Sequence, residues 1–257
     1  MRDPWKRDPG DRPRVFAHRG LALDAFENTL SAFQAALDVG VDGIEMDVSM
    51  TRDGRLVCFH DEDLRRITGT GDRLRSTTYH ELRAIPLEGH ERVPTLDEAL
   101  DVLGRERAVI LDVKPAHKLD ISIVDPIARL LRRRQADGSV PVTVSSGNYL
   151  VLNRIAVRLP WVRIAFLVSP DSVHSTIGMW GRLSRSYSAI HPQRSLVSPL
   201  TVEKWHRRGW TVSAWTVNEP DEARRVADAG VDAIITDDPR AITWSPSSSI
   251  PSSPSSP

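Results

Sequence analysis

Side chains able to do chemistry gather at apolar runs in the first quarter of the chain. His18 and Arg19 follow one run, Glu45 and Asp47 lie within a second, and His60 ends a third. Each run is typical of a buried strand. Imidazoles exchange protons near neutral pH, carboxylates hold divalent cations, and arginine binds phosphate oxygens in pairs. The combination predicts metal-assisted phosphoryl chemistry, which a packed core alone does not require.

The two acids, Glu45 and Asp47, are two residues apart in a predicted strand, so their side chains share one face. Buried acids cost free energy unless a charge compensates them, and a divalent cation with oxygen ligands does this. The alternative is an exposed strand face on which both acids are solvated. We favour a metal site because parallel strands are usually buried on both faces.

Asp112 and Lys114 repeat this spacing at the end of the run 108–113. Asp112 is therefore a candidate third metal ligand, and Lys114 is a candidate contact for a phosphate oxygen. The alternative is an ordinary ion pair between the two at the rim of a sheet, which contributes little free energy.

Histidine at a strand end is more often structural than catalytic. Two such histidines, His18 and His60, beside a candidate metal site instead favour an acid–base pair. One would accept a proton from a nucleophile, and the other would donate a proton to a leaving oxygen. Arg19 would hold the phosphate bidentately. His191 is predicted just past another strand, where its ring can line the pocket.

The elements that must position these residues alternate between strands and helices. Short apolar runs predict strands at 15–18, 43–49, 56–60, 108–113, 142–145, 162–168, 187–190, 211–217 and 233–236. Amphipathic helices are predicted between most of them, which indicates a parallel sheet closed or covered by helices. An α/β barrel of about 250 residues suits the 257-residue chain.

One strand candidate does not fit the repeat. The linker 50–55 before Leu56–His60 is shorter than the dozen residues or so that a parallel crossover needs. Asp53-Gly54 in this linker is a tight-turn signal. The sequence therefore predicts that Leu56–His60 is a hairpin partner or a protruding arm, which brings His60 back over the site.

Three further segments divide the chain. Residues 1–13 form a predicted extension, 14–244 the barrel, and 61–94 an insertion that is too long for an ordinary connection. Residues 245–257 are serine and proline apart from Ile250, a composition that predicts a disordered tail.

Composition narrows the class of protein. The 34 basic and 34 acidic side chains give a formal net charge of zero, which disfavours a nucleic-acid partner. Cys58 is the single cysteine, so no intrachain disulfide forms. No apolar run approaches the roughly 20 residues that span a bilayer, and the N-terminal residues lack a signal-like apolar core. We expect a cytoplasmic protein with a small-molecule substrate; its oligomeric state stays open.

The motifs together resemble the glycerophosphodiester phosphodiesterase family. In chain order they are His18-Arg19-Gly20, Glu27-Asn28-Thr29, Gly43–Val48 with Thr51–Gly54, His60-Asp61, Trp215–Asn218 and Gly230–Pro239. Each short motif is weak alone, but the ordered set is specific and covers about residues 15 to 240.

The resemblance implies a TIM-type (β/α)8 barrel, one divalent metal ion (Ca²⁺ or Mg²⁺), and hydrolysis of glycerophosphodiesters to an alcohol and sn-glycerol 3-phosphate. Such an enzyme belongs to lipid and glycerol metabolism. The implied roles are acid–base catalysis by His18 and His60, metal binding by Glu45, Asp47 and Asp112, a place at the site for Glu27, and a glycerol pocket lined by Trp215. We expect the reaction to pass through a cyclic phosphate, with Arg19 and Lys114 on phosphate oxygens.

Two other functions fit the same residues. One is a lysophospholipase D that uses this site on lysophospholipids, and the other is a non-catalytic protein that binds phosphodiesters. The chain also departs from the family at the third metal position, where Asp112 replaces the usual glutamate and is one methylene shorter.

Overall fold

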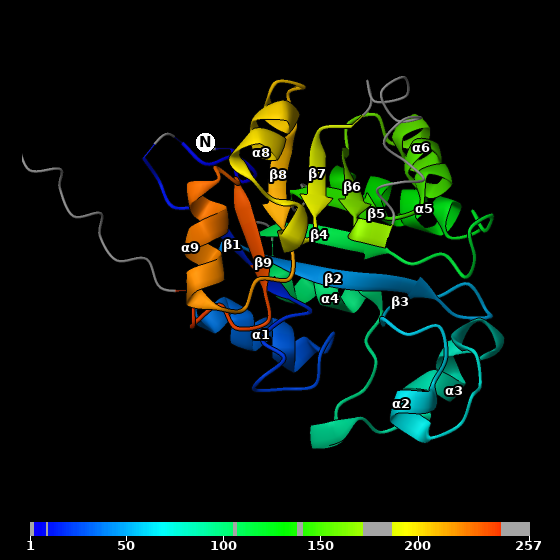
Figure 1. Ribbon diagram of the computed structural model, residues 1–257. Coiled ribbons are helices and arrows are strands. Elements are labelled where there is room, and N and C mark those ends of the chain that lie inside the picture. Colours follow the sequence, from blue (N-terminus) through cyan, green and yellow to red (C-terminus); the bar gives the residue numbers. More distant parts are fainter. Residues whose placement is uncertain (1–2, 9, 105–106, 138–140, 172–186, 243–257) are drawn as a thin grey trace, which may run out of the picture.

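A closed barrel of eight parallel strands forms the centre of the molecule (Figure 1). The computed structural model describes residues 3–8, 10–104, 107–137, 141–171 and 187–242. The barrel strands are β1 (Arg14–His18), β2 (Gly43–Met50), β4 (Ala108–Val113), β5 (Val142–Ser146), β6 (Arg163–Val168), β7 (Ala189–Pro192), β8 (Thr211–Ala214) and β9 (Ala233–Thr236). Neighbours follow chain order, and β1 pairs with both β9 and β2 to close the ring. The predicted TIM-type fold is confirmed.

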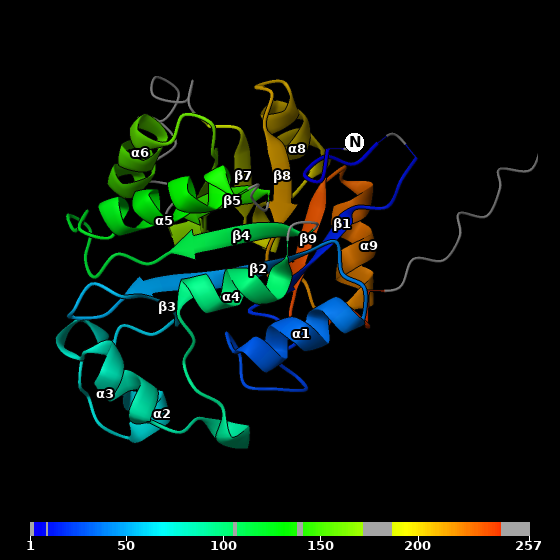
Figure 2. The same cartoon turned by 180° about the vertical axis from the view of Figure 1, so that it is seen from behind.

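Helices surround the barrel on its outside (Figures 1 and 2). They are α1 (Leu30–Asp38), α4 (Leu96–Leu103), α5 (Val124–Ala136), α6 (Tyr149–Arg158), α8 (Pro199–His206) and α9 (Pro220–Asp228), with a 3₁₀ turn η4 (Arg194–Leu196) before α8. Helix α4 begins at a capping box, in which the Thr95 and Glu98 side chains accept hydrogen bonds from each other's backbone N–H. Among the described residues, no helix is long and apolar enough to cross a bilayer.

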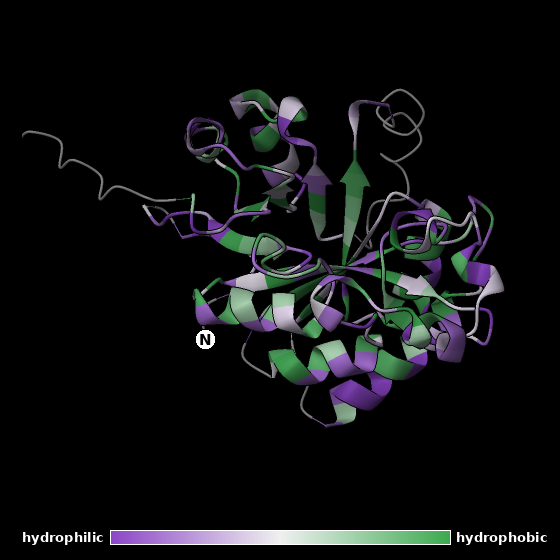
Figure 3. Ribbon diagram, turned by 90° about the horizontal axis from the view of Figure 1, so that it is seen from below, coloured by the Kyte–Doolittle hydropathy of each residue, from purple (hydrophilic) through white to green (hydrophobic). Residues whose placement is uncertain are grey.

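The main apolar core lies between the barrel and these helices. Ile44, Met46 and Val48 on β2 belong to it, as does Phe33 of α1. Apolar colouring is concentrated on the strands in Figure 3, and the helices alternate between apolar and hydrophilic residues. The outward side of β2 is thus filled by helix packing, which leaves its other side for Glu45 and Asp47.

The barrel interior changes from apolar to polar along its strands. Near the amino ends, Trp5 stacks on Phe16 with ring centroids 5.7 Å apart, and Ile110 packs in the same cluster. Two residues further along these strands stand His18 and Asp112. Because residues two apart in a strand share a face, the apolar layer forms a floor under the polar one. The polar groups therefore collect at the carboxyl ends, where barrel enzymes place their sites.

Strand β3 (Leu56–Cys58) pairs antiparallel with β2, with Val48 opposite Cys58. The predicted hairpin is therefore confirmed. The turn closes where the Gly54 N–H donates to the Thr51 carbonyl at 3.0 Å. Ser49 Oγ then donates to the Phe59 carbonyl at 2.8 Å, which fixes the residue before His60 against β2.

Residues 61–94 fold into short helical pieces beside the barrel (Figure 2). These pieces are α2 (Arg65–Thr68), η1 (Leu74–Ser76), α3 (Tyr79–Ala84) and η2 (Glu88–His90). Leu64, Leu74 and Leu82 pack with Val57 of β3 in a small separate core, and Phe26 packs against it. The segment is thus held to the loop before α1 as well as to β3.

The division into an extension (1–13), a barrel (14–244) with an insertion (61–94) and a tail stays a prediction. The tail, 245–257, lies outside the described residues.

Candidate active site

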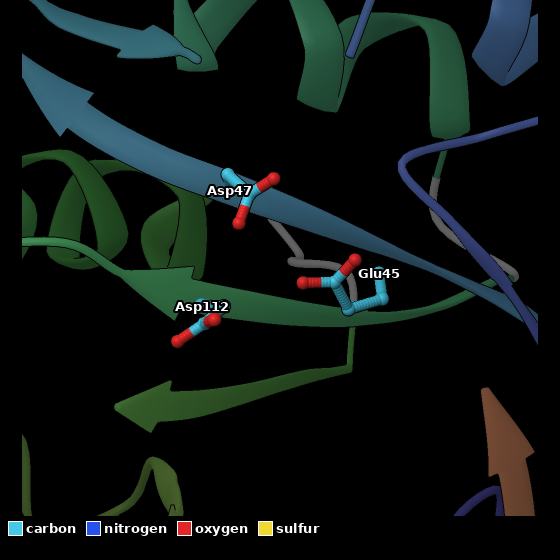
Figure 4. Close-up of side chains that lie close together, drawn as sticks. All are labelled: Glu45, Asp47 and Asp112. Atoms are coloured by element: carbon cyan, nitrogen blue, oxygen red, sulfur yellow. The ribbon is translucent and has the colours of Figure 1, made fainter. Parts of the chain in front are cut away.

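Three buried carboxylates form the centre of the site. Glu45, Asp47 and Asp112 each offer an oxygen atom, and these atoms lie within 4.8 Å of one another (Figure 4). The register of the sheet explains the grouping, because Asp47 of β2 stands opposite Asp112 of β4. Parallel strands with this register place acids from two elements at one level of the barrel.

The electrostatics of this cluster favour a cation. Burial raises the pKa of Glu45, and the neighbouring Asp47 carboxylate raises it further. One oxygen of Asp112, Oδ1, is buried and has no hydrogen-bond partner among the described residues. Oxygen donors of this kind are the ligands that Ca²⁺ and Mg²⁺ prefer. The three side chains therefore fit the predicted divalent metal, with Asp112 close enough to take part.

Lys114 lies beside the same acids. Its Nζ is 2.6 Å from Asp112 Oδ2 and 3.2 Å from Asp47 Oδ1. The ammonium thus forms the predicted ion pair, and it also lines a cavity that His18 and His60 share. Its contact with a phosphate oxygen stays a prediction. Burial lowers the pKa of Lys114, but Asp112 and Asp47 outweigh this and raise the pKa above its ordinary value. The lysine therefore stays charged.

Arg19 approaches the cluster from the loop after β1. Its backbone takes a left-handed conformation (φ +59°), and its N–H donates to the Glu45 carbonyl at 2.8 Å. Nε lies 3.0 Å from Asp47 Oδ2, and Nη1 donates to Glu27 Oε2 at 3.0 Å. Glu27 therefore lies at the site as an arginine partner and is no member of the acid cluster.

Asn28 is a site residue to which sequence reasoning gave no role. Its Nδ2 donates to Asp47 Oδ2 at 2.9 Å, and the Asp47 N–H donates to Asn28 Oδ1 at 3.1 Å. Burial would raise the pKa of Asp47, but Lys114 and Arg19, with Asn28, hold it below the ordinary value. The only sequence signal was its place in the motif Glu27-Asn28-Thr29.

His18 has a carboxylate partner on each side. Nδ1 lies 2.6 Å from Asp237 Oδ1, and Nε2 lies 3.9 Å from Glu45 Oε2. Burial lowers the pKa of His18, but Asp237 and Glu45 outweigh it and raise the pKa above 6.5. Asp237 belongs to the closing motif Gly230–Pro239, from which no role was predicted for it, and the structure adds its contact with His18.

His60 faces the same cavity as His18. This cavity of about 650 Å³ is lined by His18, Arg19, Glu45, His60, Ile110, Asp112, Lys114, Ser145, Leu167, His191, Trp215, Thr216 and Ile235. A second cavity of about 440 Å³ also has His60 and Lys114 in its wall. His60 Nδ1 lies 2.9 Å from Asp61 Oδ1. Both predicted acid–base residues thus border one space, and His60 stands where the two cavities meet.

Trp215 and His191 form part of the cavity wall opposite the acids' strands. Trp215 follows β8, and its indole Nε1 donates to the His191 carbonyl at 2.7 Å. His191 was predicted just past a strand, but it lies within β7, which begins at Ala189 and not at Tyr187. His191 is 2% exposed, and burial lowers its pKa to about 3, so its ring is neutral.

Comparisons with known proteins identify one family of phosphodiesterases. The model of the glycerophosphoryl diester phosphodiesterase family matches residues 18–241. A glycerophosphodiester phosphodiesterase of Caldanaerobacter subterraneus subsp. tengcongensis is 31% identical, and the match covers 89% of this chain and 95% of that protein. The human glycerophosphodiester phosphodiesterase 1 is 30% identical, with 83% of this chain and 74% of that protein covered.

A solved structure supports the same relationship. An Oleispira antarctica phosphodiesterase in complex with the product sn-glycerol-3-phosphate has a TM-score of 0.78 and 27% identity. The match covers 88% of this chain and 93% of that chain. Together with the family match over residues 18–241, this similarity covers most of the chain.

Proposed function

The chain belongs to the glycerophosphoryl diester phosphodiesterase family, and from this premise we propose that it hydrolyses glycerophosphodiesters to an alcohol and sn-glycerol 3-phosphate. The observation that carries the proposal is that His18 and His60 border one cavity together with Glu45 and Asp112. The product bound to the Oleispira antarctica enzyme supports the choice of glycerol 3-phosphate.

The reaction proceeds in two steps with His18 and His60 as its proton carriers. The 2-hydroxyl oxygen of the glycerol attacks phosphorus, and the bond from phosphorus to the alcohol oxygen breaks. One histidine takes the hydroxyl proton, and the other gives a proton to the departing alcohol. Water then attacks the cyclic phosphate, the bond to the 2-oxygen breaks, and the histidines return to their first protonation states.

The remaining site residues bind and orient the substrate. Arg19 and Lys114 hold phosphate oxygens, the first with a planar fork and the second as a point charge. Trp215 lines the pocket for the glycerol. A divalent metal ion held by Glu45, Asp47 and Asp112 would lower the pKa of the hydroxyl and neutralise charge on the phosphate.

Release of glycerol 3-phosphate from several glycerophosphodiesters tests the proposal. We expect His18→Ala and His60→Ala each to lower kcat by about 10²–10⁴. His80→Ala, on the exposed side of α3, is the matched control and keeps wild-type turnover. Wild-type turnover in both active-site variants would refute the assignment.

The two competing functions give different results in the same assay. Faster turnover of lysophosphatidylcholine than of glycerophosphocholine would identify a lysophospholipase D. Diester binding with no turnover under any metal would identify a non-catalytic binding protein. The choice between Ca²⁺ and Mg²⁺, the cytoplasmic location and the role in lipid and glycerol metabolism stay predictions.

A further inference from the structure

We propose that Arg66, in the segment that follows His60, is a positioning residue that holds His60 as the acid for the leaving alcohol. This inference rests on the proposed function. Arg66 belongs to α2, and sequence patterns predict no role for it. Its guanidinium lies between two carboxylates, and each of these holds a different side of the site.

The first carboxylate is Asp61, which joins Arg66 to His60. Arg66 Nε donates to Asp61 Oδ2 at 2.7 Å, and Asp61 Oδ1 lies 2.9 Å from His60 Nδ1. Asp61 thus uses one oxygen for each partner. A carboxylate at Nδ1 fixes that nitrogen as a donor and leaves Nε2 to exchange a proton with substrate.

The second carboxylate is Glu27, which joins Arg66 to Arg19. Arg66 Nη2 donates to Glu27 Oε1 at 2.7 Å, and Glu27 Oε2 accepts from Arg19 Nη1 at 3.0 Å. Again each oxygen serves one partner. The Arg66 guanidinium therefore sets the distance between the segment that carries His60 and the loop that carries Arg19.

The apolar packing around Arg66 supports this role. Its guanidinium lies over the Phe26 ring, 5.4 Å from the centroid. Phe26 packs against the small core that contains Leu64, so the segment after His60 and the loop after Arg19 share one apolar cluster. The Arg66 side chain is 43% exposed, and an ion pair that exposed adds little to stability. Its contribution is therefore to geometry, because the planar fork holds two carboxylates at fixed angles.

The position of His60 indicates which proton it handles. His60 borders both the 650 Å³ cavity and the 440 Å³ cavity, whereas His18 borders only the first. An alcohol leaving phosphorus next to His60 can pass into this second cavity, which is open to solvent. The wall of that cavity carries acidic as well as basic side chains, Asp61 and Glu62 beside Arg73 and Arg75.

Two substrates that differ in their leaving group test the inference. Glycerophosphocholine releases an alcohol that needs a proton, whereas the p-nitrophenyl ester of glycerol 3-phosphate releases a stable phenolate. We expect Arg66→Ala to lower kcat on glycerophosphocholine about 10- to 100-fold and to change kcat on the p-nitrophenyl ester less than about threefold. His60→Ala should show the same selectivity with a larger loss, and Arg66→Lys should recover only part of the activity.

Arg65→Ala, the neighbouring arginine on α2, is the matched control and keeps wild-type kcat on both substrates. Asp61→Asn should act on the same contact, so its effect and that of Arg66→Ala should not add in the double variant. Equal losses on both substrates, or no loss on either, would overturn the inference. A wild-type protein that hydrolyses neither substrate would instead refute the proposed function.

Discussion

His18 and Asp237 meet across the seam at which the barrel closes, with Nδ1 and Oδ1 2.6 Å apart. His18 ends β1, and Asp237 follows β9, the strand that pairs with β1. Asn218 Nδ2 donates to the other Asp237 oxygen at 2.6 Å, so this carboxylate is itself held in place. A residue near the start of the chain is thus oriented by one near its end.

Replacement of this carboxylate tests its part in catalysis. We expect Asp237→Asn to lower kcat about 10- to 100-fold with little change in KM, because the His18 ring loses its orientation. Asp237 raises the pKa of His18, so the pH limb that His18 controls should move to lower pH in the variant. An unchanged pH profile together with unchanged kcat would contradict this role.

The acid cluster predicts a dependence on metal ions. EDTA should abolish release of glycerol 3-phosphate, and Mg²⁺ or Ca²⁺ should restore it. Metal binding to the folded state should also raise Tm. Asp112→Asn should need a metal concentration on the order of 10²-fold higher for the same rise in Tm. Asp101→Asn, an exposed acid on α4, is the control. Unchanged turnover in the presence of EDTA would contradict the metal site.

The sequence predicted those parts of the site that depend on a single strand. The alternation of β2 places Glu45 and Asp47 on one face, and the short linker before Leu56 predicts the hairpin. The contact of Asp47 with Asp112 depends on the register between β2 and β4, which a single sequence does not specify. Periodicity therefore identified the candidates but not their contacts.

The two missed partners show the same limit at longer range. Asp237 lies 219 residues from His18, and only closure of the barrel brings them together. Its signal was present in the closing motif, but no local rule connects that motif to His18. Arg66 had no signal at all, because it is one of two adjacent arginines in a segment of weak periodicity. Its importance follows from the packing of that segment against Phe26.

The buried His191 predicts a loss of stability in mild acid. Burial lowers its pKa to about 3, whereas the unfolded state has the ordinary value of 6.5. Its neutral form is favourable above pH 6.5, and this contribution is lost as pH falls from 6.5 towards 3, because only the unfolded state then binds the proton. Between pH 7.5 and 5.0 the loss in free energy of unfolding should be about 2 kcal/mol. Urea titrations at both pH values should show this difference shrinking in His191→Asn; the same pH dependence in both proteins would contradict it.

The loop after His18 packs so closely on α1 that position 20 has no space for a side chain. Its backbone has φ +82°, and an added Cβ would lie 2.6 Å from the Ala32 carbonyl carbon of α1. Gly54 in the β2–β3 turn has a similar φ of +77° with nothing within 4 Å, so it is the matched control. Gly54→Ala should cost about 1–2 kcal/mol for the left-handed backbone alone. Gly20→Ala should cost about 1–3 kcal/mol more because the loop must move away from α1.

That movement would displace Arg19, so kcat should fall in Gly20→Ala and not in Gly54→Ala. Urea titrations and turnover of both variants measure this, and equal costs would show that the loop adjusts without strain.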